Sequence, residues 1–421
     1  MGTIQLSYST FGLTNLDFLD AIDAVHRAGY AGIEIAFHHR QFNPFNLDDD
    51  ALATVKKRLD VTGIKPACVA TASHFFTSSR PHEPSLMAFS LAGRKRRIDL
   101  VKRGIRVARQ LGAPFVTFGS GFIREEHVRN PSVNPHDLLL DSIQECLREI
   151  REDDDISLLI EPEPGMFTET LEQGLSLISE IDSPRFRLHV DLCHAYCSEK
   201  NYIDALAKAA PVTGYLHISD TQEGYNLKLV PDSDHLTFDL DFASVLVYFP
   251  STADYLLVDR SHPLYFCDDK PDRSRQRRIE ELLARARVQK PPVFVHYPSL
   301  YAGTSPLDDE IFTYLISVPG LGFEVLERAK PILAYLRGAK NPPLVNKRVA
   351  NTLTGVVHFH EIPGVGTLDF DASFRALTGN GFTGYGSVEL YHHVEFWQKA
   401  LTESYRHLSQ FTSANRRPQG L

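Results

Sequence analysis

The chain has 421 residues, of which 43% are hydrophobic and 23% charged, a composition typical of a globular protein with one large domain and an added module. The formal net charge of −9 argues against a nucleic-acid-binding surface. No apolar run approaches the roughly 18 residues of a membrane span, and the first residues do not resemble a signal peptide. We therefore expect neither nucleic acid nor a membrane as a partner.

The cysteine content indicates a reducing compartment. There are five cysteines and no CxxC pair: Cys68, Cys146, Cys193, Cys197 and Cys267. An odd number in a chain of this length does not suggest a disulfide framework, so a cytoplasmic location is predicted. Cys193 and Cys197 flank His194, which is a possible metal-binding arrangement, but the neighbouring acids are better ligand candidates.

Eight short β-branched or apolar runs recur along the chain, and amphipathic segments separate them. The runs cover residues 4–10, 31–37, 65–73, 114–121, 157–164, 186–194, 213–220 and 384–391. The helical segments 15–29, 96–112 and 137–152 show apolar residues three to four positions apart, as amphipathic helices do. Alternating strands and helices predict parallel pairing, and eight such units predict a closed (β/α)8 TIM barrel.

The spacing of the runs predicts an insertion. The seventh and eighth runs are separated by a far longer stretch than the others, and the segment "HFHEIPGVGTLDF", residues 358–370, reads as a return to a barrel loop. Residues 1–220 and 356–421 would then form a discontinuous barrel. Residues 221–355 would form an inserted α/β subdomain. Since barrel loops at the carboxyl ends of strands border the active site, we expect this subdomain near the barrel mouth, where it would cover the site or build an interface.

Charged side chains stand at the carboxyl ends of four predicted strands. They are Glu161, Asp191, His217 and Glu389, with Glu163 and His194 close behind. In a barrel these ends meet at one face. A lone acid there could cap a helix or pair with arginine, but converging acids repel each other unless a cation is present. A set of oxygen and nitrogen donors suits a catalytic divalent metal, with Mn²⁺ ranked first and Zn²⁺, Co²⁺ and Mg²⁺ as alternatives.

The segments "LLIEPEPG", "HVDLCHAY", "LHISD", "IPGVGTLDF" and "GYGSVELY" resemble, in this order, motifs of the xylose-isomerase-like TIM barrels. Within that superfamily of sugar isomerases and epimerases, the chain most resembles the ketose 3-epimerases. The resemblance implies that Glu161, Asp191, His217 and Glu389 bind one metal ion, and that Glu161 and Glu389 are also catalytic.

The resemblance also implies residues that contact the substrate. His194 matches a substrate-binding histidine, while Glu163, Glu34 and His74 fall where substrate-binding residues often lie. The epimerases carry an arginine shortly after the histidine of the seventh strand, and "HISDTQEGYNLK" has none. His358, His360 and Glu361 could replace it, and His360 ranks first.

Several functions are compatible with these residues. The leading hypothesis is an isomerase or epimerase that acts on a small polyhydroxylated substrate, such as a sugar, sugar phosphate or cyclitol. It would remove a proton beside a carbonyl and use one carboxylate on each side. A dehydratase of a keto-sugar or keto-cyclitol would begin in the same way. A phosphodiester endonuclease would need more histidines, yet Gly119 stands where the fourth strand would supply one. A non-catalytic binding protein is the remaining alternative, and a homodimer is possible.

Overall fold

The computed structural model describes residues 2–71, 75–76, 82–123, 127, 130, 132–164, 166–221 and 360–412, together with strands β8 to β15 between residues 228 and 358. Within this part of the chain, no helix is long and apolar enough to cross a membrane. The four cysteines that lie within it are buried and not in disulfides: Cys68, Cys146, Cys193 and Cys197.

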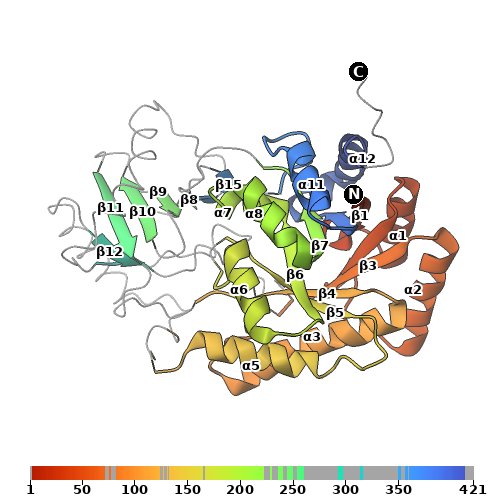
Figure 1. Cartoon of the computed structure of the whole chain (residues 1–421), viewed down its shortest axis with the longest axis horizontal. Coiled ribbons are helices and arrows are strands. Elements are labelled where there is room, and N and C mark those ends of the chain that lie inside the picture. The colour runs from red at the N-terminus through yellow and green to blue at the C-terminus, as the bar shows by residue number, and fades with distance from the viewer. Residues whose placement is uncertain are drawn as a thin grey trace.

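Eight parallel strands close into a barrel in the order β1-β16-β7-β6-β5-β4-β3-β2 (Figure 1). They are β1 (Ile4–Ser9), β2 (Gly32–Ala36), β3 (Lys65–Ala70), β4 (Phe115–Gly119), β5 (Ser157–Glu161), β6 (Phe186–Asp191), β7 (Thr213–Ile218) and β16 (Gly384–Val388). Each of the eight predicted runs contains one of these strands, so the predicted TIM barrel is confirmed.

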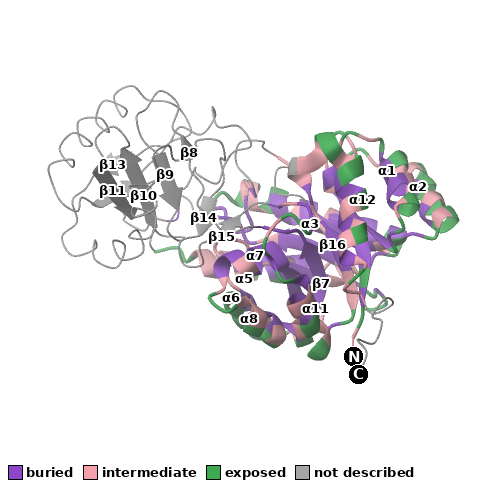
Figure 2. Cartoon of the chain, turned by 90° about the horizontal axis from the view of Figure 1, so that it is seen from above, coloured by how far each residue is buried: buried purple, intermediate pink, exposed green. Residues whose placement is uncertain are grey.

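Helices surround the barrel, and their apolar sides pack on its outer face (Figure 2). They are α1 (Phe18–Arg27), α2 (Asp49–Thr62), α3 (Leu91–Leu111), α5 (Pro135–Leu147), α6 (Leu171–Ile181), α7 (Leu192–Ser198), α8 (Tyr202–Ala209), α11 (Phe370–Gly379) and α12 (Trp397–Leu408). Short 3₁₀ turns lie at η1 (Thr10–Leu13), η2 (Ala210–Val212) and η4 (Tyr391–Phe396). In α1, for example, Ala21, Ile22 and Val25 are fully buried, as the predicted three-to-four spacing requires.

The segment between β7 and β16 contains two further sheets. A six-stranded sheet has the order β13-β12-β11-β10-β9-β8 and comprises β8 (Lys228–Leu229), β9 (Leu236–Asp239), β10 (Ser244–Phe249), β11 (Asp254–Asp259), β12 (Val293–His296) and β13 (Thr313–Leu315). Strands β14 (Val349–Asn351) and β15 (Val356–His358) form an antiparallel pair that includes residues on both sides of the predicted boundary at 355. The remainder of the segment lies outside the described residues, so its predicted subdomain stays a prediction.

The two ends of the insertion are tied together at the end of β7, and we call this contact the neck. Asp220 and Glu361 exchange two backbone hydrogen bonds of 2.8 Å. The Asp220 carboxylate accepts hydrogen bonds from the backbone N–H groups of Gly364 (2.8 Å), Gly366 (2.9 Å) and Leu368 (3.1 Å). Gly364 has a φ of +94°, a conformation that glycine adopts readily. The "PGVG" turn thus wraps around one carboxylate, and this fixes the loop that begins at residue 360.

Replacing Gly366 by alanine should destabilise the neck. An added Cβ would lie 2.1 Å from the Thr221 carbonyl oxygen and 2.5 Å from Asp220 Oδ1. We expect a loss of about 1–3 kcal/mol in the free energy of unfolding, as for other overpacked sites, measured by urea denaturation. Gly379→Ala is the control, because an added Cβ there meets nothing within 4 Å. Equal stability of the two variants would show that the neck can relax around the methyl group.

Candidate active site

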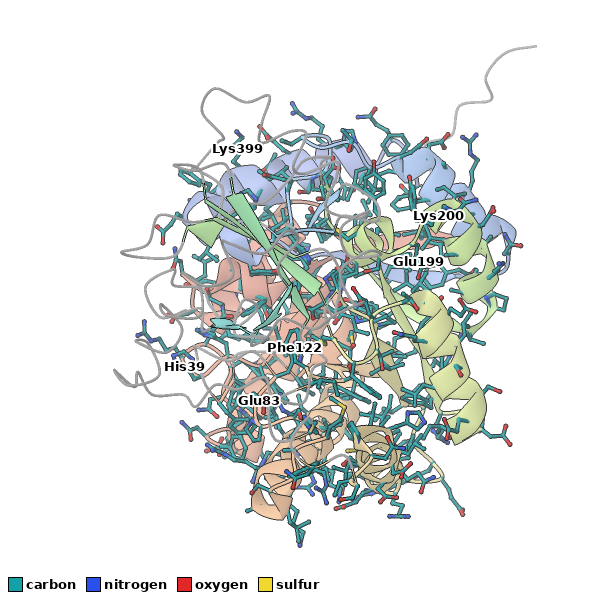
Figure 3. The ribbon with its side chains drawn as sticks, turned by 90° about the vertical axis from the view of Figure 1, so that its left-hand side faces the viewer. His39, Glu83, Phe122, Glu199, Lys200 and Lys399 are labelled. Atoms are coloured by element: carbon teal, nitrogen blue, oxygen red, sulfur yellow. The ribbon has the colours of Figure 1, made fainter. Side chains whose placement is uncertain are left out.

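The strand register brings the predicted ligands to one end of the barrel. Asp191 pairs with His217 across β6 and β7, and His217 pairs with Ser387 of β16. Glu161 ends β5, and Glu389 directly follows β16. Figure 3 labels His39 and Phe122, which lie in the loops that follow β2 and β4.

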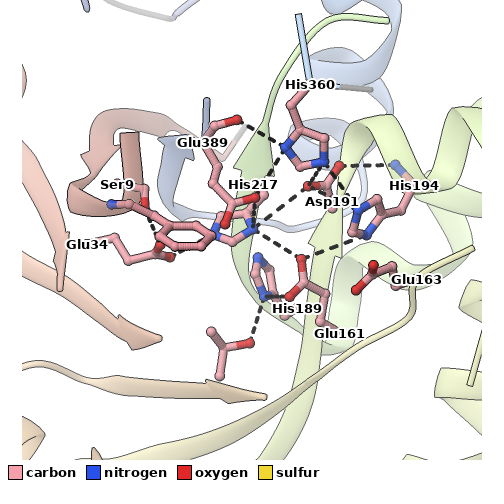
Figure 4. A network of polar contacts seen from close by, with 12 residues as sticks. Ser9, Glu34, Glu161, Glu163, His189, Asp191, His194, His217, His360 and Glu389 are labelled. Atoms are coloured by element: carbon pink, nitrogen blue, oxygen red, sulfur yellow. Dashed lines mark hydrogen bonds and ion pairs between the residues drawn. The ribbon is translucent and has the colours of Figure 1, made fainter. Parts of the chain in front are cut away.

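His217 lies at the centre of the predicted ligand set (Figure 4). Its Nδ1 atom is 3.1 Å from Glu161 Oε1, 3.6 Å from Glu389 Oε2 and 3.8 Å from Asp191 Oδ2. The Asp191 side chain is fully buried, whereas those of Glu161 and Glu389 are 14% exposed. The two glutamates are therefore the ligands that an entering substrate could reach.

Glu34 fixes His217 from the other side of the ring. The His217 Nε2–H group donates to Glu34 Oε2 at 2.7 Å, and the Ser9 hydroxyl donates to Glu34 Oε1 at 2.6 Å. Glu34 and Ser9 are fully buried. A hydrogen on Nε2 leaves Nδ1 as the atom that faces the other carboxylates. Glu34 was predicted to bind substrate, but its burial beneath His217 favours a positioning role.

Asp191 uses its two carboxylate oxygens for different purposes. Oδ1 accepts a 3.0 Å hydrogen bond from the His194 backbone N–H and so caps the N-terminus of α7. Oδ2 is buried and has no hydrogen-bond partner. Since an unsatisfied buried carboxylate oxygen is costly, its position beside His217 indicates that a cation belongs there.

His194, His360 and Glu163 lie at the rim of this cluster. His194 Nδ1 is 3.1 Å from the Pro162 carbonyl oxygen, and His360 Nδ1 is 3.2 Å from Glu389 Oε2. The chain segment that enters the neck at Glu361 thus carries His360 to the ligands. Burial, the largest influence on Glu163, raises its pKa to about 7.

Two further histidines of the cluster were not predicted. His189 is fully buried, with Nδ1 2.7 Å from Thr117 Oγ1 and 3.5 Å from Glu161 Oε2. His82 Nε2 is 3.5 Å from Glu163 Oε2. His189 lies two residues before Asp191 on the same strand, and this alternation could have identified it. His82 comes from a loop with no such pattern.

The electrostatics of the cluster favour a bound cation. Burial raises the pKa of Glu161 to about 8, against the opposing effect of His217. Burial lowers the pKa of His217, but the neighbouring carboxylates of Glu34, Glu389 and Glu161 outweigh it and hold the pKa well above 6.5. Each acid would be ionised more easily with a positive charge among them.

The distances around His217 Nδ1 fit a divalent metal ion. Donor atoms that share one cation at 2.0–2.3 Å lie roughly 3.0–3.7 Å apart. The separations of 3.1 and 3.6 Å from the two glutamates lie within this range, and the 3.8 Å separation from Asp191 lies just beyond it. Several three-residue groups among the described residues could hold a metal, and they include Glu161, Asp191, His217 and Glu389. The four predicted ligands thus lie together, as do the predicted rim residues Glu163, His194 and His360. His74 lies outside the described residues.

Glu34→Ala should weaken metal binding without removing a ligand. The substitution frees the His217 ring to change its tautomer and orientation, and loss of such a supporting carboxylate typically costs about 10–100-fold in metal affinity. Calorimetric titration with Mn²⁺ or Zn²⁺ measures the effect. Ser9→Ala, which leaves the Glu34–His217 contact in place, should change the affinity much less. An unchanged affinity in Glu34→Ala would contradict the positioning role.

Comparison with known proteins gives one family match. The model described as a xylose isomerase-like TIM barrel matches residues 22–247, and no curated protein gives a significant match. One similar solved structure is a D-tagatose 3-epimerase-like protein, with 12% sequence identity, coverage of 97% of this chain and 99% of that chain, and a TM-score of 0.53. A xylose isomerase domain protein from Alicyclobacillus acidocaldarius has 12% identity, coverage of 97% of this chain and 98% of that chain, and a TM-score of 0.52. The IOLI protein with a bound zinc atom has 14% identity, coverage of 97% of this chain and 100% of that chain, and a TM-score of 0.51. At these identities the structural likeness concerns the fold.

Proposed function

Because the chain belongs to the xylose isomerase-like TIM-barrel family, we propose that it is a metal-dependent isomerase or epimerase of a sugar, sugar phosphate or cyclitol. The observation that carries this proposal is the pair formed by Glu161 and Glu389. Both carboxylates approach the same His217 nitrogen, from β5 and from the end of β16, and both are partly exposed. Two carboxylates beside one substrate position are what proton transfer next to a carbonyl requires.

In this proposal Glu161, Asp191, His217 and Glu389 hold one divalent cation. When bound, it would act as a Lewis acid that polarises a substrate carbonyl and acidifies the adjacent C–H group. Mn²⁺ remains the first candidate. The IOLI structure contains zinc, which makes Zn²⁺ the next metal to test.

The protein groups would then move the proton. One of Glu161 and Glu389 accepts it from the carbon beside the carbonyl, and the other returns one to the opposite face or to the neighbouring carbon. The rim residues His194, His360 and Glu163 lie where they can position substrate hydroxyl groups. Glu34 would hold His217, and His189 would support Glu161 from below (3.5 Å).

Solvent isotope exchange tests the reaction class. The metal-loaded protein is incubated in D₂O with a panel of ketoses, ketose phosphates and keto-cyclitols, and products are followed by NMR and mass spectrometry. Deuterium at the carbon beside the carbonyl is the expected result. A product that differs from the substrate only in configuration or carbonyl position and in the deuterium it has taken up identifies an isomerase or epimerase, whereas loss of water identifies the dehydratase. Turnover without deuterium would contradict the two-carboxylate reaction.

Phosphodiester hydrolysis is the second candidate, and one observation favours it. A phosphodiesterase of this kind needs several histidines near the metal. His189, His194 and His360 lie beside the proposed ligands, and His82 contacts Glu163. Gly119 stands where a phosphodiesterase would carry a histidine, and a Cβ added there would lie 2.7 Å from His82 Cε1. His82 therefore occupies the space that a side chain at position 119 would need. Hydrolysis of bis(p-nitrophenyl) phosphate by the metal-loaded protein, without any keto-sugar exchange, would favour this function.

A further inference from the structure

A histidine that the proposed reaction leaves unused faces Glu163 from the loop after β3. His82 Nε2 is 3.5 Å from Glu163 Oε2. The His82 side chain is 11% exposed and that of Glu163 is 22% exposed, so an entering substrate would reach the carboxylate before the imidazole. Figure 4 shows Glu163 beside His194, and its carboxylate interacts electrostatically with His194 and Glu389. His82 therefore stands behind a residue at the rim of the proposed site.

The backbone at the end of β4 provides the space for the loop that carries His82. A Cβ added at Gly119 would lie 2.7 Å from His82 Cε1, and one added at Gly121 would lie 2.6 Å from Ser85 Cβ. In a close-packed interior, atoms do not approach this closely without displacement, so neither position has room for a side chain. The two glycines of the segment "FGSG" thus leave open the surface on which residues 82–85 lie.

The same stretch of backbone fixes the loop that carries Glu163. The Thr168 N–H group donates to Ser120 Oγ at 3.0 Å, and the Glu163 N–H group donates to the Thr168 carbonyl oxygen at 3.2 Å. Since β4 lies between β3 and β5 in the barrel, residues 119–121 hold both loops. The approach of His82 to Glu163 therefore follows from contacts that the backbone makes on both sides of β4.

The backbone of His82 is itself held in an unusual conformation. Its φ is +61°, in a region that residues other than glycine seldom adopt and that costs free energy. Arg97, which is buried, anchors the loop by donating from Nε to the Pro84 carbonyl oxygen at 2.8 Å. The Phe122 ring packs edge-on against the imidazole, with 6.1 Å between the ring centroids. Backbone strain of this kind persists where the surroundings impose it, and it is frequent at functional sites.

We propose that His82 is a positioning residue that holds the Glu163 carboxylate in place for a hydroxyl group of the substrate. The imidazole pairs with Glu163 Oε2 and leaves Oε1 to accept a hydrogen bond from the substrate. Because a carboxylate only accepts hydrogen bonds, the matching group is a neutral hydroxyl, and a phosphate at this end would be repelled. The inference rests on the proposed function and deepens it, since it assigns one end of the substrate to the loops after β3 and β5.

The kinetics of four variants test the positioning role, with the ketose that exchanges deuterium fastest as substrate. His82→Ala should raise KM by about 10-fold, the effect of losing a hydrogen bond to a charged group, and leave kcat nearly unchanged. Gly119→Ala should act in the same way, because the added methyl group would push the His82 ring aside. The double variant should add little to either, since both substitutions break one contact. His82→Gln, which restores an N–H donor, should recover part of the loss.

A matched control and two measurements separate positioning from packing. Gly379→Ala, where an added Cβ meets nothing within 4 Å, should keep the wild-type KM. Tm and metal content are measured for every variant. A lower Tm with an unchanged KM would show that His82 only fills the space over Gly119, and this would overturn the proposal. A loss of kcat with an unchanged KM would overturn it as well.

Binding without turnover separates this inference from the proposed function. Erythritol, ribitol and mannitol are titrated into the metal-loaded protein, and binding is followed by saturation-transfer NMR. At least one of them should bind the wild type, and about 10-fold more weakly His82→Ala and Gly119→Ala. Weaker binding in the variants without exchange on any keto-sugar rejects only the proposed function. Exchange with a wild-type KM in the variants rejects only the role of His82, and a wild type that neither binds nor exchanges rejects both.

Discussion

Glu161→Gln and Glu389→Gln are each expected to abolish exchange of solvent deuterium into the substrate. Glutamine keeps the size of the side chain but is neither an acid nor a base in water, so one half of the proton transfer is lost. General acid–base groups typically contribute 10²- to 10⁴-fold, and we expect at least about this loss in kcat for each variant. NMR of the product formed in D₂O measures it.

A matched control separates the loss of chemistry from the loss of metal. Glu163→Gln changes a carboxylate only two residues from Glu161 that is 3.5 Å from His82 and is not among the proposed ligands. It should retain deuterium exchange and alter mainly KM. Metal content of all three variants is measured alongside. If Glu161→Gln or Glu389→Gln still exchanged deuterium at the wild-type rate, proton transfer by the two glutamates would be excluded.

His217→Ala is expected to cost more metal affinity than loss of Glu34. A residue that hydrogen-bonds to a metal ligand contributes about 10–100-fold to metal affinity. His217→Ala instead removes a ligand itself, the one that lies between the other three. It also leaves buried carboxylates without their positive neighbour, which commonly destabilises a protein by about 3–5 kcal/mol.

Thermal denaturation with and without metal gives the second readout. Metal that binds only the folded state stabilises it by about 4 kcal/mol at 1,000 times Kd, so Tm of the wild type should rise on addition of Mn²⁺ or Zn²⁺. The rise should be largely absent in His217→Ala. It should be intact in His136→Ala, which removes a histidine that pairs with Glu180. If metal raised the Tm of His217→Ala as much as that of the wild type, the metal would bind at another site.

The barrel and its ligand set follow from features that a sequence displays directly. Apolar strands alternate with amphipathic helices, and a closed parallel barrel brings all strand ends to one face. Glu161, Asp191, His217 and Glu389 could therefore be grouped without knowledge of any distance.

The sequence could not predict how deeply a site residue is buried, or which residues the loops bring into the site. Glu34 lies on its strand like a substrate-binding acid, but only the register with Ser9 and the contact with His217 reveal that it is buried. His82 reaches Glu163 through a loop and has a φ of +61°, which no local pattern indicates. His194 Nε2 lies 3.3 Å from His360 Nε2, although the insertion separates the two residues in the sequence. Sequence spacing therefore carries no information about this contact.

The neck also has a consequence for the order in which the chain folds. His217 and Ser387 are paired neighbours in the barrel, yet about 170 residues separate them, against about 32 without residues 222–359. By loop-closure entropy this longer connection costs about 1.5 kcal/mol before the eighth strand can dock. The contacts that Asp220 makes with the "PGVG" turn hold the returning chain beside β7 and so offset that cost. Closure of the barrel would then be a late event that depends on the neck, and variants there should slow refolding more than they speed unfolding.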